Sequence, residues 1–279
     1  EPPAPLAAVE PADDPAGPPV VTAAAWAVVD AATGELLLGR NADEKRQQAS
    51  VTKIMTALVV LERAVAAPES LDEVVRVSTR AGTETGSTAQ LRPGDGVTVR
   101  DLLHGLLLPS GNDAAVALAE HVGATVEGGG DPLDRFVAAM NARAAALGLQ
   151  QTTYGNPHGL TVEGCGSTPR EIAAVAREAL RQPLFREIVA SRRRTVRLAN
   201  LDGYERDVVW NNTNKLLGIE GYDGIKTGTT TPAGCCLASS GVRGGRRLIV
   251  VVLGSTSTEA RYADTRNLFR HAWRTLGVD

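Results

Sequence analysis

The sequence predicts an α/β protein in which an antiparallel sheet is interrupted by a group of helices. Three observations support this fold class: strand patterns lie at both ends of the chain, helical patterns fill the middle, and the strands come as hairpins. Hairpins join antiparallel neighbours, whereas a doubly wound parallel sheet would alternate single strands with helices. We therefore expect a discontinuous sheet domain formed by residues 20–61 and 165–279, with a helical subdomain at 62–164.

The overall composition excludes several classes of protein. The chain has 279 residues, 43% of them apolar and 22% charged, and a formal net charge of −3. These values are ordinary for a soluble globular protein and do not fit a mainly disordered or collagen-like chain. The near-neutral balance argues against nucleic acid as a partner. We also expect no transmembrane segment, because no apolar run approaches the ~18 residues that a membrane span needs.

The first 19 residues differ in composition from the rest. Seven of the 15 prolines fall in residues 1–19, which predicts a flexible Pro/Ala-rich segment. The chain begins with Glu1 rather than Met, so we expect a processed or trimmed product that has already lost any signal peptide. The cysteines are odd in number and two are adjacent, so we expect no disulfide framework and a packing role for the adjacent pair (Cys165, Cys235 and Cys236).

The strand and helix patterns of the first third are clear. Residues 25–30 and 35–39 flank a turn around Gly34 and predict a hairpin. A helix is expected from about Ser50, because apolar residues then recur at helical spacing until Pro68 (Ile54, Leu58, Leu61 and Val65).

The middle third is predicted to be helical, at residues 101–108, 114–122, 132–148 and 168–180. Asp131 and Pro132 have the N-cap and first-turn chemistry of a helix start, and Thr168 begins a capping box. The last third returns to strands, at residues 195–199, 205–210, 224–229, 235–240 and 247–254, before a terminal helix at 257–276.

Three short motifs carry the candidate chemistry. They are Ser50-Val51-Thr52-Lys53, Ser110-Gly111-Asn112 and Lys226-Thr227-Gly228. Each is weak alone, but chance would place all three in such a chain only about 0.002 times. Lysine usage adds independent support, because the chain uses arginine for most of its 29 basic residues and has only four lysines, two of them in these motifs.

The spacing of Ser50 and Lys53 suits nucleophilic catalysis. Three residues apart at a helix start, the two side chains share one face. A serine hydroxyl needs a neighbour that takes its proton, and a lysine can do so only when it is neutral. Burial and a nearby positive charge favour the neutral amine, and Lys226 could supply that charge. Arginine could not replace Lys53, since it keeps its proton.

These residues resemble the serine-type D-alanyl-D-alanine carboxypeptidases of the penicillin-binding protein family of bacterial cell walls. The resemblance extends over roughly residues 24–254. It is carried by residues 49–56, 106–115, 156–160, 212–217 and 224–228, which contain the three motifs.

The resemblance implies a fold and a role for each site residue. The fold is that of penicillin-binding proteins and β-lactamases, a five-stranded antiparallel sheet flanked by helices with an inserted, mostly helical subdomain. Ser50 would be the acylated nucleophile, Lys53 its base and Ser110 a proton relay to the leaving amine. Asn112 would hold Lys53 and the substrate amide. The remaining site residues would bind substrate, with Lys226 and Thr227 at its carboxylate and Thr229 completing the oxyanion hole (Lys226, Thr227, Gly228 and Thr229).

The resemblance also implies the substrate and the setting. The substrate would be a peptidoglycan stem peptide that ends in D-Ala-D-Ala, and β-lactam antibiotics would be covalent inhibitors. No cofactor is implied. The protein would act outside the cytoplasm, in the periplasm, at the cell wall or as an extracellular enzyme. Many members continue into a further β domain and a membrane-binding helix, so a chain that stops at Asp279 is expected to be a minimal soluble form or a trimmed one.

Three other functions that the same fold can carry differ in the motifs that they require. Class A β-lactamases carry a water-activating glutamate in a Glu-x-x-Leu-Asn segment, and none lies between Asn112 and Lys226. A D,D-endopeptidase would share every motif, so the sequence leaves it open. A catalytically silent wall-binding module would not need the intact motifs.

A metal-dependent peptidase is disfavoured by the histidines. They are widely spaced and form no His-Glu-x-x-His motif, so we predict no metal site (His104, His121, His158 and His271). We expect His158 to hold its own loop.

Overall fold

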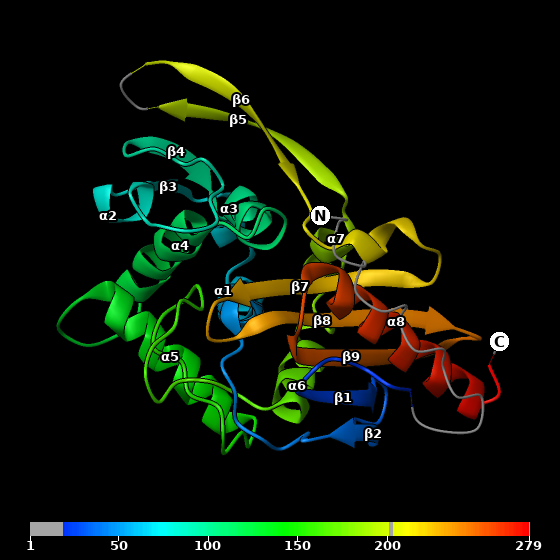
Figure 1. Ribbon diagram of the computed structural model, residues 1–279. Coiled ribbons are helices and arrows are strands. Elements are labelled where there is room, and N and C mark those ends of the chain that lie inside the picture. The colour runs from blue at the N-terminus through cyan, green and yellow to red at the C-terminus, as the bar shows by residue number, and fades with distance from the viewer. Residues whose placement is uncertain (1–18, 201–202, 279) are drawn as a thin grey trace, which may run out of the picture.

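The computed structural model describes residues 19–200 and 203–278 (Figure 1). The predicted N-terminal segment 1–19 lies outside the described residues except for Pro19, and so does the centre of the predicted turn at 200–203.

A five-stranded antiparallel sheet brings the two ends of the chain together, as predicted. Its order is β2 (Leu36–Arg40), β1 (Ala25–Asp30), β9 (Arg246–Ser255), β8 (Gly234–Arg243) and β7 (Tyr222–Thr230). β1 pairs with β9 along its whole length, with Trp26 opposite Val252. The N-terminal hairpin therefore completes a sheet whose other three strands are more than 180 residues away in the sequence.

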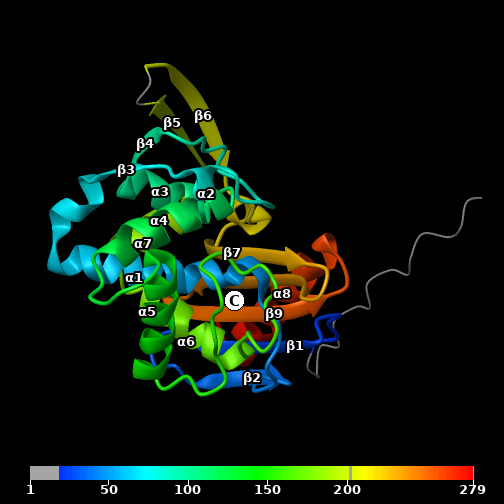
Figure 2. The same ribbon diagram turned by 90° about the vertical axis from the view of Figure 1, so that its left-hand side faces the viewer.

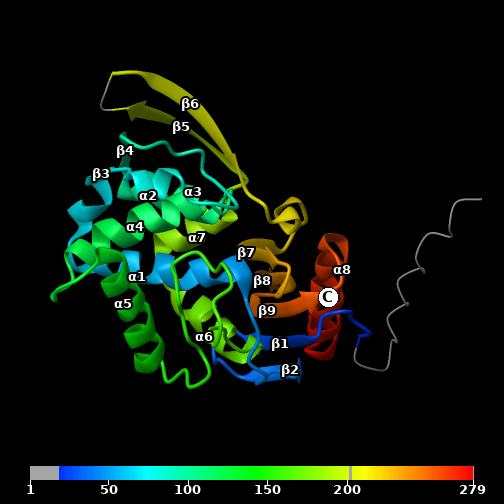
Figure 3. The same ribbon diagram turned by 60° about the vertical axis from the view of Figure 1, so that its left-hand side comes forward.

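The two faces of this sheet are covered by different helices. α8 (Thr258–Thr275) lies on one face, and α6 (Pro169–Ala179) and α1 (Lys53–Ala66) lie on the other (Figure 3). Side chains alternate along a strand, so Trp26 of β1 packs in the α8 core with Phe269, while Ala27 belongs to the core that α1 shares. Neighbouring cysteines separate in the same way, since Cys236 is in the α1 core and Cys235 Sγ lies 4.0 Å from Thr258 Oγ1. All three cysteines are free.

The helical part stands beside the sheet and surrounds α1 (Figure 2). It contains α3 (Val99–Leu107), α4 (Asn112–Ala124) and α5 (Pro132–Ala146). The predicted helix starts are confirmed, because Asp131 accepts a hydrogen bond from the Leu133 amide and Thr168 accepts one from the Glu171 amide.

A second sheet was not expected. It has the order β3 (Val74–Arg76), β4 (Asp95–Thr98), β5 (Arg193–Asn200) and β6 (Glu205–Asn211). β5 and β6 were predicted as strands, but they do not join the larger sheet. They pair with each other as a long hairpin (Figure 1), and β5 also pairs with β4.

Several short elements had no sequence signal. β3 and β4 are three and four residues long, too short for a recognisable alternation. The others are single turns or begin at a proline within a region of mixed composition (α2, Thr79–Gly82; α7, Pro183–Ala190; and the 3₁₀ turns at Pro68–Asp72 and Lys215–Gly218).

Candidate active site

Ser50 lies in a 3₁₀ turn, Ala49–Thr52, that leads directly into α1 at Lys53. The predicted helix start is therefore confirmed. Two glycines let other segments approach this turn closely. A methyl group on Gly228 of β7 would lie 2.9 Å from the Ser50 nitrogen, and one on Gly159 would collide with the Ala49 carbonyl. The turn is consequently clamped between β7 and the loop at residues 156–160.

Lys53 is the centre of the hydrogen-bond network. Its Nζ lies 2.9 Å from Ser50 Oγ, 2.7 Å from Asn112 Oδ1 and 2.9 Å from the His158 carbonyl oxygen. The side chain is fully buried. Three elements, α1, α4 and the 156–160 loop, thus converge on one amine.

The environment of Lys53 favours its neutral form. Burial, and then the positive charge of Lys226, hold the pKa of Lys53 well below its usual value, against smaller opposing effects of Asp113 and Glu84. The direction of the effect of Lys226 on Lys53 is the one that the sequence analysis expected. The imidazole of His158 also favours its neutral form, because burial, with an added effect of Lys53 whenever that amine is charged, lowers its pKa to about 4.

Asn112 and Ser110 come from the link between α3 and α4. Asn112 is the first residue of α4, and its Nδ2 donates to the Thr85 carbonyl oxygen at 2.6 Å. That contact fixes the amide so that Oδ1 faces Lys53. Ser110 is buried in the preceding turn with a φ of 68°, a left-handed conformation unusual for serine. Its hydroxyl joins none of the three Lys53 contacts.

Lys226 and Thr227 lie on β7, the edge strand of the larger sheet. Lys226 Nζ donates to the Thr227 carbonyl oxygen at 3.0 Å, and the Thr227 hydroxyl lies 2.7 Å from that of Thr213. Burial and the neighbouring charge of Arg261 lower the pKa of Lys226 to about 7. A carboxylate bound beside Lys226 would stabilise the charged form of this amine.

Sequence reasoning missed Arg261 of α8. Its guanidinium is buried and donates to the Gly228 carbonyl oxygen at 3.2 Å and to Thr229 Oγ1 at 3.0 Å. It therefore adds a permanent positive charge beside Gly228 and Thr229, two of the residues predicted to bind substrate. It belongs to no motif, and only the packing of α8 across β8 brings it there.

The carbonyl oxygen of His158 was missed for a different reason. Any residue type can supply a main-chain oxygen, so side-chain chemistry gives no signal for it. The predicted structural role of His158 is confirmed, since its Nδ1 accepts from the Leu160 amide at 3.2 Å.

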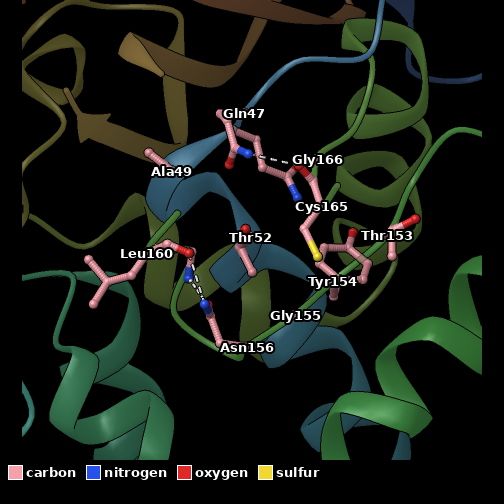
Figure 4. Close-up of a pocket in the computed structure, with 12 residues that line it drawn as sticks. Gln47, Ala49, Thr52, Thr153, Tyr154, Gly155, Asn156, Leu160, Cys165 and Gly166 are labelled. Carbon is pink, nitrogen blue, oxygen red and sulfur yellow. Dashed lines mark hydrogen bonds between the residues drawn. The ribbon is translucent and has the colours of Figure 1, made fainter. Parts of the chain in front are cut away.

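A small cavity of about 20 Å³ lies between the turn at residues 49–52 and the loop that follows α5 (Figure 4). Its walls include Ala49, Thr52, Asn156 and Cys165, but none of the predicted site residues. It has room for about one water molecule and is too small for a peptide. The face where Ser50, Lys53, Asn112 and β7 meet remains the candidate active site.

The part of the chain that the structure describes contains no candidate metal site and no candidate membrane span. Within residues 19–200 and 203–278, no three side chains of the metal-binding types His, Cys, Asp and Glu come together as a possible ion site. In the same part of the chain, no helix has the length and apolar character to span a bilayer.

Comparisons with known proteins agree on one family. The model of the D-alanyl-D-alanine carboxypeptidase family matches residues 12–257. The D-alanyl-D-alanine carboxypeptidase of Streptomyces sp. strain K15 is 36% identical over 261 residues, which cover 91% of this chain and 88% of that protein. The DacF carboxypeptidase of Bacillus subtilis is 34% identical over 88% of this chain, but this match spans only 61% of that relative.

Solved structures give the same result. The crystal structure of the Streptomyces K15 DD-transpeptidase superposes with a TM-score of 0.85 at 35% identity, over 92% of this chain and 99% of that one. The predicted penicillin-binding protein fold is therefore confirmed.

Proposed function

Because the chain belongs to the D-alanyl-D-alanine carboxypeptidase family, we propose that it is a serine peptidase that removes the terminal D-alanine from peptidoglycan stem peptides ending in D-Ala-D-Ala. Ser50 is the nucleophile in this proposal, and Lys53 is the general base. The substrate is part of the bacterial wall, so the proposed site of action lies outside the cytoplasmic membrane and requires export.

The single observation that supports this proposal best is the set of partners around Lys53 Nζ. Asn112 Oδ1 and the His158 carbonyl can only accept hydrogen bonds, whereas the Ser50 hydroxyl can also donate. A neutral amine has two protons and one lone pair. The two protons go to the two obligate acceptors, which leaves the lone pair directed at Ser50 Oγ. This is the arrangement that a base needs to take the serine proton.

The proposed reaction has two steps. Ser50 Oγ attacks the carbonyl carbon of the penultimate D-alanine while its proton passes to Lys53. The C–N bond then breaks as a proton, relayed from Lys53 through Ser110, reaches the leaving nitrogen, and free D-alanine departs. Water next attacks the ester, gives a proton to Lys53 and releases the shortened peptide, and the proton returns to Ser50.

The same geometry supports a set of binding roles. Lys226 and the Thr227 hydroxyl would bind the C-terminal carboxylate, with Arg261 strengthening the positive field below Gly228. The backbone N–H groups of Ser50 and Thr229 would stabilise the negative oxygen that forms during attack.

The test of the proposed function is release of free D-alanine from a pentapeptide that ends in D-Ala-D-Ala. The wild-type protein should release it, and Ser50→Ala should not. Ser191→Ala, a change of a partly exposed serine just after α7, is the matched control and should behave as wild type. D-alanine release that persists in Ser50→Ala would refute the assignment of Ser50 as the nucleophile. Absence of release by the wild-type protein would refute the proposed function.

Penicillin should acylate Ser50 and then leave slowly. The ring nitrogen of an opened β-lactam stays attached and blocks the approach of water, so rapid release requires a separate base such as the β-lactamase glutamate. Mass spectrometry of the treated protein should place the adduct on the Ser50 peptide. Recovery of D-alanine release over many minutes supports a carboxypeptidase, whereas recovery within seconds would favour a β-lactamase.

A second candidate function is transfer of the acyl group to an amine. The solved relative is named a DD-transpeptidase, although the corresponding curated protein is named a carboxypeptidase. Adding a free amino-acid acceptor to the pentapeptide assay separates the two. A carboxypeptidase yields mainly the tetrapeptide, and a transpeptidase yields mainly the acceptor adduct.

A further inference from the structure

Asp113 has no part in the mechanism above, yet its carboxylate is fully engaged beside the site. It is 2% exposed and lies at the start of α4, next to Asn112. It accepts hydrogen bonds from Thr88 Oγ1 at 2.6 Å, from the Ala89 amide at 2.9 Å and from the Leu91 amide at 3.1 Å. All three donors belong to residues 85–91, which we call the 85–91 segment. It lies in the connection between α2 and β4 (Figure 1).

The same segment holds Asn112 at two points. The Asn112 amide donates to the Ser87 carbonyl oxygen at 2.7 Å, and its side-chain Nδ2 donates to the Thr85 carbonyl oxygen at 2.6 Å. Gly86 lies so close that a methyl group there would be 2.7 Å from Asn112 Nδ2. The direction of the Asn112 amide, and hence the contact of Oδ1 with Lys53, depends on where this segment lies.

We infer that Asp113 is a positioning residue, whose buried carboxylate fixes the 85–91 segment on α4 and thereby holds the Asn112 amide against Lys53. The inference rests on the proposed function, because it assigns Asp113 a role in preparing Lys53 for its task. Asp113 acts through Asn112 and is not placed in contact with substrate.

The hydrogen bonds explain why an ionised carboxylate is required at this position. Besides its three donors in the segment, Asp113 Oδ1 also accepts from the Ala114 amide at 2.8 Å. Four donors converge on two oxygens, which a carboxylate can satisfy and an amide cannot. In Asp113→Asn, an NH₂ group would face at least one of these donors and push the segment away.

The charge of Asp113 gives the inference a signature that a purely structural role lacks. The charged groups that face Lys53 are Lys226 from β7, which lowers its pKa, and Asp113 and Glu84, which raise it. His158, in the loop opposite, stays neutral. Removing the Asp113 charge should therefore lower the pKa of Lys53 further. Because the neutral amine is the active form, the acidic limb of the acylation rate should move to lower pH.

Trp210 of β6 provides a matched comparison without any change of charge. Its Nε1 donates to the Ala89 carbonyl oxygen at 2.7 Å and so also holds the 85–91 segment. Trp210→Phe removes this hydrogen bond and keeps an aromatic ring in the core. It should loosen the segment while leaving the charges around Lys53 as they are.

The experiment measures the rate constant for acylation by a fluorescent penicillin as a function of pH, with melting temperatures as the folding control. Asp113→Asn should lower the plateau rate about tenfold or more, since a misplaced catalytic group is costly, and should shift the acidic limb to lower pH. Trp210→Phe should lower the plateau with the limb unmoved.

The outcomes separate the inference from the proposed function. A wild-type protein that is not acylated refutes both. If the wild type is acylated, an unchanged plateau or an unmoved limb in folded Asp113→Asn overturns the inference alone. If Asp113→Asn does not fold, Trp210→Phe decides, and a wild-type plateau in that variant overturns the role of the segment.

Discussion

At the scale of single residues, the two buried lysines differ from the arginines around them because an ammonium can lose its proton. Burial lowers the pKa of both Lys53 and Lys226. The charge of Lys226 adds to this effect at Lys53, and the charge of Arg261 adds to it at Lys226, whose pKa falls to about 7. Arg261, buried nearby, stays charged and contributes to the repulsion that Lys226 experiences. In the proposed mechanism Lys53 is the base, Lys226 is a cation that can lose its charge, and Arg261 is a permanent cation.

Replacing Lys53 with arginine should nearly abolish acylation. The charge is preserved, but arginine cannot accept the Ser50 proton, so the acylation rate by penicillin should fall at least ~10²-fold. Retention of more than about a tenth of the wild-type rate in a folded Lys53→Arg variant would show that another group is the base.

The value of kcat/KM should fall at alkaline pH as Lys226 loses its proton. Its pKa is lowered to about 7 in the free protein, so the charge that binds the substrate carboxylate is present below that pH and lost above it. In kcat the same limb should lie at higher pH, because a bound carboxylate stabilises the ammonium.

Lys226→Arg provides the check on that assignment. Arginine keeps its charge, so the alkaline limb of kcat/KM should disappear or move to much higher pH. A limb that stays in place in this variant would belong to a different group.

At the scale of elements, the site depends on the close approach of β7 to the turn that precedes α1. Gly228 permits this approach, because its missing side chain leaves room for the Ser50 nitrogen and the Gln48 carbonyl oxygen. The backbone of Gly228 is not left-handed, so an alanine at this position would act only through the space that its methyl group takes. This makes the dependence testable.

Gly228→Ala should reduce acylation strongly, since a new methyl group would lie 2.9 Å from the Ser50 nitrogen and force β7 away from the turn. The rate with fluorescent penicillin should drop about 10²-fold, as expected when reacting groups are displaced by about 1 Å. Gly129→Ala, at a position with open space around it, is the control and should match wild type. Equal rates in the two variants would contradict the argument.

At the scale of the whole molecule, one core joins the sheet to the helices. It includes Ala27 of β1, Met55 of α1, Leu103 of α3 and Leu118 of α4. α1 itself runs from Lys53 to Ala66 and so crosses the boundary at 61/62 that the sequence suggested. Elements that share one hydrophobic core are expected to unfold together.

We therefore expect a single cooperative thermal transition. Far-UV and near-UV circular dichroism should give coincident melting curves, although the sequence predicted a sheet domain and an inserted helical subdomain. Two resolved transitions would show that the sheet and the helical part unfold independently and would support the predicted division.

The sequence by itself determined the chemistry and most of the secondary structure. Ser50 and Lys53 are three residues apart at a helix start, so local geometry alone places them on one face. The long strands and capped helices were predicted for the same reason, because alternation, turns and caps are properties of neighbouring residues.

Only the tertiary structure decided which distant groups surround those residues. The His158 carbonyl, Arg261 and the Asp113-bound segment reach the site through the packing of separate elements, and no local pattern encodes that meeting. The second sheet has the same origin, since β3 and β4 become strands only where β5 pairs with β4. Local interactions determine which secondary structure a segment can form, whereas long-range burial and hydrogen bonding determine its tertiary contacts.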